Sequence, residues 1–104
     1  WRLDKLGQAV SPAAVRRGGG TSLHAIGRGA CYDAADGRID FQTLDAALIA
    51  PDRPRLLDYR ADPAPPRGGL HVNLHNNVWG TNFPAWYGED TRFRFRVALE
   101  PAAA

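Results

Sequence analysis

The sequence is poor in several residue types, and each shortage argues against a class of function. Cys31 is the only cysteine, which excludes an internal disulfide and a cysteine-based zinc site. Methionine is absent and the sequence begins with Trp1, which we interpret as the mark of a fragment or a processed piece. Lys5 is the single lysine beside twelve arginines. The arginines are scattered and the formal net charge is only +2, which argues against a nucleic-acid-binding surface.

Long apolar runs are also missing. No stretch approaches the roughly 20 apolar residues that a membrane-spanning helix needs, and no signal peptide is visible, so we expect no membrane partner. Hydrophobic residues make up 44% of the 104 positions, but 17 of them are alanines, which bury little area. We therefore expect one small domain, or part of a larger one, with a modest core of its own.

What the sequence does contain is the pattern of short β-strands. Apolar and polar residues alternate over residues 38–44, 70–75 and 91–99, and alternation with period two is typical of half-buried antiparallel strands. Asp36-Gly37 predicts a tight hairpin turn before the first of these strands. Further short strands are expected at residues 21–26, 30–33, 45–50 and 55–59. The fold class predicted is therefore an all-β antiparallel β-sandwich with short strands and no long helix.

The same pattern divides the chain into three parts. Residues 1–20 have no convincing period and end in Gly18-Gly19-Gly20, so we predict an irregular N-terminal connector. Residues 21–99 form the β-sheet region, and residues 100–104 a short tail. In the last predicted strand Phe93, Phe95, Val97 and Leu99 are expected to be buried, with Arg92, Arg94 and Arg96 facing water.

Residues with catalytic chemistry are present but do not form a recognisable site. His71 and His75 on one strand would stand roughly 13 Å apart, too far for one metal ion, so we predict no metal site and no cofactor in this chain. No carboxylate spacing specifies a hydrolytic pair, and nucleophile-elbow and phosphate-loop motifs are missing. Asp45 lies beside an apolar run; if it is buried it must be paired or hydrogen-bonded, and Arg92 and Arg94 are candidate partners. We predict no catalytic residue in this chain.

Residues 73–90 are rich in aromatic and amide side chains and allow two interpretations. As a structural corner, Asn76, Asn77 and Asn82 bond nearby backbone in Asx-type turns, Gly80 turns the chain, and Trp79 is buried. As a binding loop, Trp86 and Tyr87 present their rings to a sugar and the amides bond its hydroxyls. We favour the corner, with Trp86, Tyr87 and Asn82 as a secondary rim that contacts carbohydrate.

The chain resembles the C-terminal β-sandwich region of α-mannosidase-like proteins of glycoside hydrolase family 38. The resemblance rests on Asn76-Asn77-Val78-Trp79-Gly80-Thr81-Asn82, on Phe93-Arg94-Phe95-Arg96 and on Thr43-Leu44-Asp45-Ala46-Ala47-Leu48-Ile49, in which Ala47 departs from an expected proline. The Asn-Asn-x-Trp-x-Thr-Asn run is the specific part. The segments Phe83-Pro84-Ala85-Trp86-Tyr87 and "DKLGQAVSP" look closest to an uncharacterised bacterial branch of the family.

The resemblance implies that this β-sandwich is part of a larger one, and that the chain is a non-catalytic portion of a carbohydrate-active enzyme. Its partner would be the catalytic domain of the parent enzyme, which would carry the zinc ion and the catalytic carboxylates, and its loops would shape the rim of the sugar cleft. Two alternatives remain from the residues alone. One is a free-standing carbohydrate-binding module that uses Trp79, Trp86 and Tyr87. The other is a β-rich interaction module unrelated to sugars.

Overall fold

The computed structural model describes residues 1–14, 18–55, 58–62, 65–75, 86 and 88–102. Within these residues the chain is all-β, without a helix, which confirms the predicted fold class. The strands are β1 (Arg2–Lys5), β2 (Gln8–Val10), β3 (His24–Ala25), β4 (Gly29–Ala34), β5 (Gly37–Thr43), β6 (Leu48–Pro51), β7 (Leu70–Asn73) and β8 (Phe95–Pro101).

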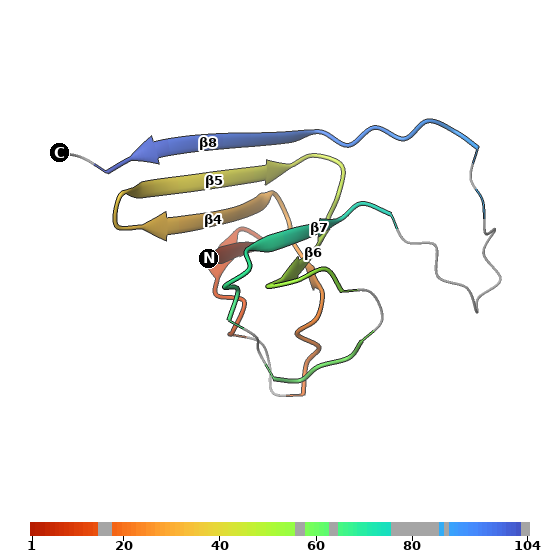
Figure 1. Cartoon of the computed structure of the whole chain (residues 1–104), viewed down its shortest axis with the longest axis horizontal. Coiled ribbons are helices and arrows are strands. Elements are labelled where there is room, and N and C mark those ends of the chain that lie inside the picture. The colour runs from red at the N-terminus through yellow and green to blue at the C-terminus, as the bar shows by residue number, and fades with distance from the viewer. Residues whose placement is uncertain (15–17, 56–57, 63–64, 76–85, 87, 103–104) are drawn as a thin grey trace.

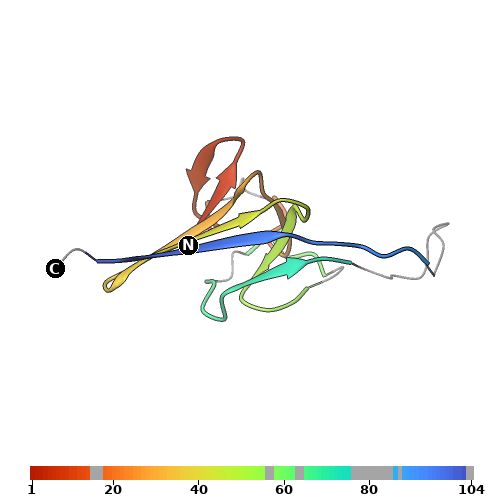
Figure 2. The ribbon, with the colours of Figure 1, turned by 90° about the horizontal axis from the view of Figure 1, so that it is seen from above.

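The strands form two antiparallel sheets. The larger has five strands in the order β2-β1-β4-β5-β8, and the smaller has three in the order β3-β6-β7. The smaller sheet lies on one side of the larger one (Figure 2). The β4–β5 turn and the C-terminal half of β8 extend beyond the smaller sheet (Figure 1). The second layer therefore covers only one end of the five-stranded sheet.

The β4–β5 hairpin forms where the Asp36-Gly37 dipeptide predicts it. Ala34 pairs with Gly37, and the register continues without interruption to Gly29 opposite Gln42. A Cβ atom on Gly37 would lie 2.4 Å from the carbonyl oxygen of Glu100 in β8. Glycine is thus required at this turn because the neighbouring strand passes too close for any side chain.

The N-terminal segment corrects our prediction of an irregular connector over residues 1–20. Residues 2–10 form the β1–β2 hairpin, which pairs with β4 through Leu3 opposite Ala30. The turn consists of Leu6 with φ of 54° and Gly7 with φ of 85°. Two positive φ angles are typical of a hairpin turn that favours Asn-Gly. Leucine is not a typical residue at a positive-φ turn position, so the Leu6-Gly7 pair did not indicate a turn and the sequence pattern did not reveal the hairpin.

The core lies where the two sheets overlap. Leu3 of β1 and Ile49 of β6 are 1% and 0% exposed, and Ile26 and Ala30 complete the buried cluster. Trp1, Leu70 and Val72 pack against it and are themselves partly buried. The core therefore contains few residues, as the alanine-rich composition predicts.

The last strand corrects a second prediction. β8 spans Phe95–Pro101 rather than residues 91–99, so the strand continues into the predicted tail, and all of it is exposed. Phe95, Val97 and Leu99 are 40%, 60% and 72% exposed, so the prediction of their burial was wrong. The alternation itself is correct, because these residues lie opposite Thr43, Phe41 and Ile39 on one face of the sheet. They are exposed because the smaller sheet does not reach them.

Two further predicted strands are shorter than expected or missing. Only His24–Ala25 of residues 21–26 is a strand. Arg55, Asp58 and Tyr59 lie outside the strands. Arg55 is buried and pairs with the Asp58 carboxylate, while the Tyr59 hydroxyl donates to the carbonyl of Gly18. The Tyr59 bond thus holds the segment after Pro54 against the residues that precede the sheet region.

Candidate functional site

Most of the predicted rim and corner residues lie outside the described residues, so their predictions stay predictions. They are Asn76, Asn77, Trp79, Gly80, Asn82 and Tyr87. Trp86 alone of this set is described, and it is 82% exposed. A Cβ atom on Gly88 would lie 2.5 Å from the indole Cη2 of Trp86, so the ring rests against the Gly88 backbone. An exposed indole face of this kind is chemically suited to stacking on a sugar ring.

A second candidate surface is the uncovered end of the five-stranded sheet, which we call the open face. It consists of Tyr32, Ile39, Phe41, Phe95, Val97 and Leu99, contributed by β4, β5 and β8. The rings of Phe41 and Phe95 stack with centroids 5.6 Å apart, and Trp1 contacts Tyr32 at 5.0 Å. Contiguous apolar residues across three neighbouring strands are typical of a surface that another layer covers.

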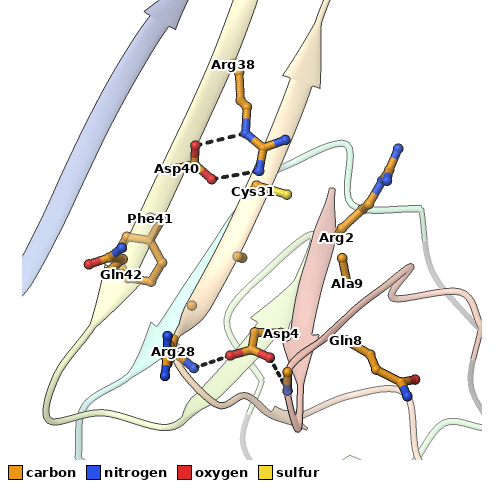
Figure 3. Close-up of a pocket in the computed structure, with 13 residues that line it drawn as sticks. Arg2, Asp4, Gln8, Ala9, Arg28, Cys31, Arg38, Asp40, Phe41 and Gln42 are labelled. Carbon is orange, nitrogen blue, oxygen red and sulfur yellow. Dashed lines mark hydrogen bonds and ion pairs between the residues drawn. The ribbon is translucent and has the colours of Figure 1, made fainter.

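The opposite face of the same sheet is polar and holds a hollow of about 220 Å³ (Figure 3). Arg38 bonds Asp40 through Nε and Nη2 at 2.8 and 3.0 Å, and it also reaches Asp33 at 3.2 Å. Asp4 accepts the backbone N–H groups of Gly7 and Arg28, each at 2.7 Å. Both carboxylates in the hollow are therefore engaged within the protein itself.

These contacts determine the protonation state of the two carboxyl groups in the hollow, Asp4 and Asp40. The backbone N–H of Arg28, followed by that of Gly7, lowers the pKa of Asp4, and the hydrogen bonds from Arg38 lower the pKa of Asp40. Both groups stay ionised near neutral pH and are unsuited to donate a proton. The hollow thus resembles a structural ion-pair network more than an acid–base site.

Asp45 finds its partner in Arg94, one of the two arginines that the sequence suggested. Its carboxylate accepts the backbone N–H of Arg94 at 2.8 Å, Nε at 2.9 Å and Nη2 at 2.8 Å. These bonds, led by the guanidinium, lower the pKa of Asp45 to about 2. The pair fixes the segment after β5 to the residue just before β8, and it is a structural feature.

The histidines are dispersed. His24 is 3% exposed, His71 contacts the carbonyl of Asp52 through Nε2 at 3.2 Å, and His75 is exposed. In the part of the chain that the structure describes, no three His, Cys, Asp or Glu side chains gather in an arrangement that could hold a metal ion.

The open face is the feature that sequence reasoning missed. Alternation correctly assigned Phe95, Val97 and Leu99 to one side of β8, but periodicity carries no information about whether a second layer lies over that side. The available signal was the alanine content, which predicted a small core without indicating where it ends.

Comparisons with known proteins bring no relative. No family model, no curated protein and no solved structure matches the chain. Within the described ranges, no helix has the length and apolar character needed to cross a membrane.

Proposed function

We propose that this chain is a non-catalytic β-sandwich portion of a family-38-like carbohydrate-active enzyme, and that its open face packs against the rest of that protein. The observation that carries the proposal is the exposure of Val97 and Leu99 beside Phe41 on a continuous apolar sheet surface. Leaving such side chains in water forfeits about 1.5–3 kcal/mol each relative to burial. A covering layer from a larger protein would recover this free energy.

The resemblance to family 38 supports this choice of larger protein. The family's last strands carry the motif found here at residues 76–82 and 93–96, and the family places zinc and the catalytic carboxylates in a separate domain. The engaged carboxylates of Asp4, Asp40 and Asp45 support a portion without its own acid–base chemistry. Trp86 supports a role at the rim of a sugar cleft.

Measuring the mass and the hydrolytic activity of the intact protein from its source tests this proposal. We expect its measured mass to exceed that of 104 residues by many hundreds of residues, with α-mannoside hydrolysis that a zinc chelator abolishes. A natural protein of only this length would contradict the proposal and favour a free-standing module.

A pair of variants then locates the packing surface. Val97→Asp places a charge on the open face, and Gln42→Asp places the same charge on the polar face of the neighbouring strand. In the intact protein, Val97→Asp should lower the melting temperature by several degrees and Gln42→Asp should leave it nearly unchanged. Equal effects of the two variants would show that the open face does not carry the contact.

The exposed indole of Trp86 favours a second candidate function, a free-standing carbohydrate-binding module. In that case the chain alone should bind mannosides, with a change in tryptophan fluorescence that Trp86→Ala removes. Wild-type fluorescence that mannosides leave unchanged in both the chain and the intact protein would contradict a role for Trp86 in sugar binding.

A further inference from the structure

The outer edge of β8 is a second unsatisfied surface, distinct from the open face. β8 is the last strand of the five-stranded sheet, and among the described residues no strand pairs with its outer side. Its pairing with β5 runs one-to-one from Phe95 to Pro101, so no bulge interrupts it. The strand contains no lysine, its charged residues are Arg96 and Glu100, and its only proline is its last residue. Edge strands of monomeric proteins usually contain a bulge, a lysine or an internal proline, which hinders pairing with another chain.

The backbone groups on this edge can be assigned from the bonds to the inner side. Leu44 donates its N–H to the carbonyl of Arg94, and Ala102 donates to the carbonyl of Asp36. In an antiparallel pair, residues alternate between bonding to one neighbour and facing the other. The even-numbered residues of β8 therefore bond β5. Hence Phe95, Val97 and Leu99 direct both N–H and C=O to the free edge, while Pro101 directs only its C=O.

The side chains of β8 are self-complementary about Ala98. If a second β8 pairs antiparallel with Ala98 opposite its own copy, Val97 lies opposite Leu99 on the apolar face. On the polar face Arg96 lies opposite Glu100, so the two charged pairs attract. In this register the residues that face each other with free backbone groups are Val97 with Leu99 and Phe95 with Pro101, as antiparallel pairing requires.

We propose that the protein forms a two-fold dimer in which β8 pairs antiparallel with β8 of a second copy, centred on Ala98. The five-stranded sheets join into one continuous sheet, and the two open faces become neighbours on the same side. Charge selects this register. A shift of two residues places Glu100 opposite either Arg94, which Asp45 already holds, or Ala98, which has no charge. The dimer concerns the edge of β8, and it does not depend on the proposed relation to a carbohydrate-active enzyme.

Cross-linking tests the register directly. With Cys31 replaced by Ala, the variant Ala98→Cys carries one cysteine at the proposed two-fold axis. Opposite residues without mutual backbone bonds have Cα atoms about 4.5 Å apart, which is within the range for a disulfide. The matched control is Ala34→Cys in the same background, an exposed position at the far end of β4. We expect Ala98→Cys to form a disulfide-linked dimer at least tenfold faster under mild oxidation.

Equal rates for the two variants would overturn the proposal. An unfolded chain exposes both cysteines alike and would also give equal rates, so light scattering on the wild-type chain provides a second, independent measurement. A monomer at every concentration up to about 100 μM would also overturn the proposal, because a dissociation constant above that range is too weak for a specific dimer.

Charge reversal separates this register from other contacts. Arg96→Glu or Glu100→Arg alone places like charges opposite one another, and we expect about a tenfold weaker dimer from each. The double variant Arg96→Glu/Glu100→Arg restores opposite charges and should recover the wild-type dissociation constant to within about threefold. Circular dichroism confirms that each variant keeps its strands, since Glu100 also lies opposite Arg38 in β5. A double variant no tighter than the single ones would exclude the Ala98-centred dimer.

Discussion

The two ends of one sheet face in this protein have similar residues and opposite environments. At one end Leu3 and Ala30 lie beneath Ile49 of the smaller sheet and are almost completely buried. At the other end Leu99 and Val97 occupy equivalent positions and are mostly exposed. The difference arises because the smaller sheet covers Leu3 and Ala30 and does not cover Val97 and Leu99.

This comparison shows that the alternation of an amphipathic strand identifies the face that could be buried, but does not show that another layer covers that face. The β5–β8 pair has the alternation of a buried sheet, yet Phe95, Val97 and Leu99 on its apolar side are exposed. Burial free energy, about 25 cal/mol per Å² of apolar surface, is gained only where another layer excludes water. We therefore expect substitutions at the covered end to destabilise the chain much more than those at the open end.

A pair of identical substitutions should give the largest contrast. Leu3→Ala removes a side chain that is 1% exposed, and Leu99→Ala removes one that is 72% exposed. We expect Leu3→Ala to lower the free energy of unfolding by about 3–4 kcal/mol because it leaves a cavity. Leu99→Ala should cost less than about 1 kcal/mol, since little apolar contact is lost. Urea denaturation of the isolated chain measures both, and similar losses would show that the open face is covered in solution.

Phe95→Ala should give an intermediate effect. Phe95 is 40% exposed and stacks on Phe41, so truncation removes part of its burial and one aromatic contact. We expect a loss of about 1–2 kcal/mol in the isolated chain. In an intact protein that covers the open face the loss should rise to about 3–5 kcal/mol. The same value in both settings would argue against a covering layer at this position.

Leu6→Asn should stabilise the β1–β2 hairpin, which flanks the covered end. Leu6 is fully exposed and has φ of 54°, which asparagine tolerates better than leucine. We expect a gain of about 0.5–1 kcal/mol in the free energy of unfolding, read from chemical denaturation. The control is Leu44→Asn, an exposed leucine outside the positive-φ positions, which should bring no gain. A loss of stability for Leu6→Asn would show that the turn does not adopt this geometry.

We expect the smallest effect from pH, and it belongs to the covered end. Burial of His24, followed by the nearby charge of Lys5, lowers the pKa of its imidazole below the ordinary value of 6.5. The unfolded chain then binds a proton more readily, so stability is complete above pH 6.5 and declines as the pH falls below it. Thermal melting between pH 7.5 and 5 should reveal this decline. His75→Gln, an exposed control, should leave it unchanged; a flat profile in the wild type would exclude the effect.

Prediction from the sequence succeeded where information was local. Asp36-Gly37 marked its hairpin and alternation identified β5, β7 and β8, because turn chemistry and side-chain period are properties of neighbouring residues. It failed for β1 and β2, since Leu6 occupies a turn position that it normally avoids. Of the candidate site, only the exposed Trp86 can be compared with the structure. The predictions for Asn76, Asn77, Trp79, Gly80, Asn82 and Tyr87 concern residues outside the described part.

The sequence by itself determined that the chain is all-β, that its sheet has one apolar and one polar face, and that Arg92 and Arg94 are candidate partners of Asp45. Only the tertiary structure decided that Arg94 is this partner and that the smaller sheet covers Leu3 but leaves Leu99 exposed. The physical reason is that alternation and turn propensity act between adjacent residues. Burial, in contrast, depends on segments such as β6 that are distant in the chain, and their reach is set by the lengths of the loops and strands that carry them.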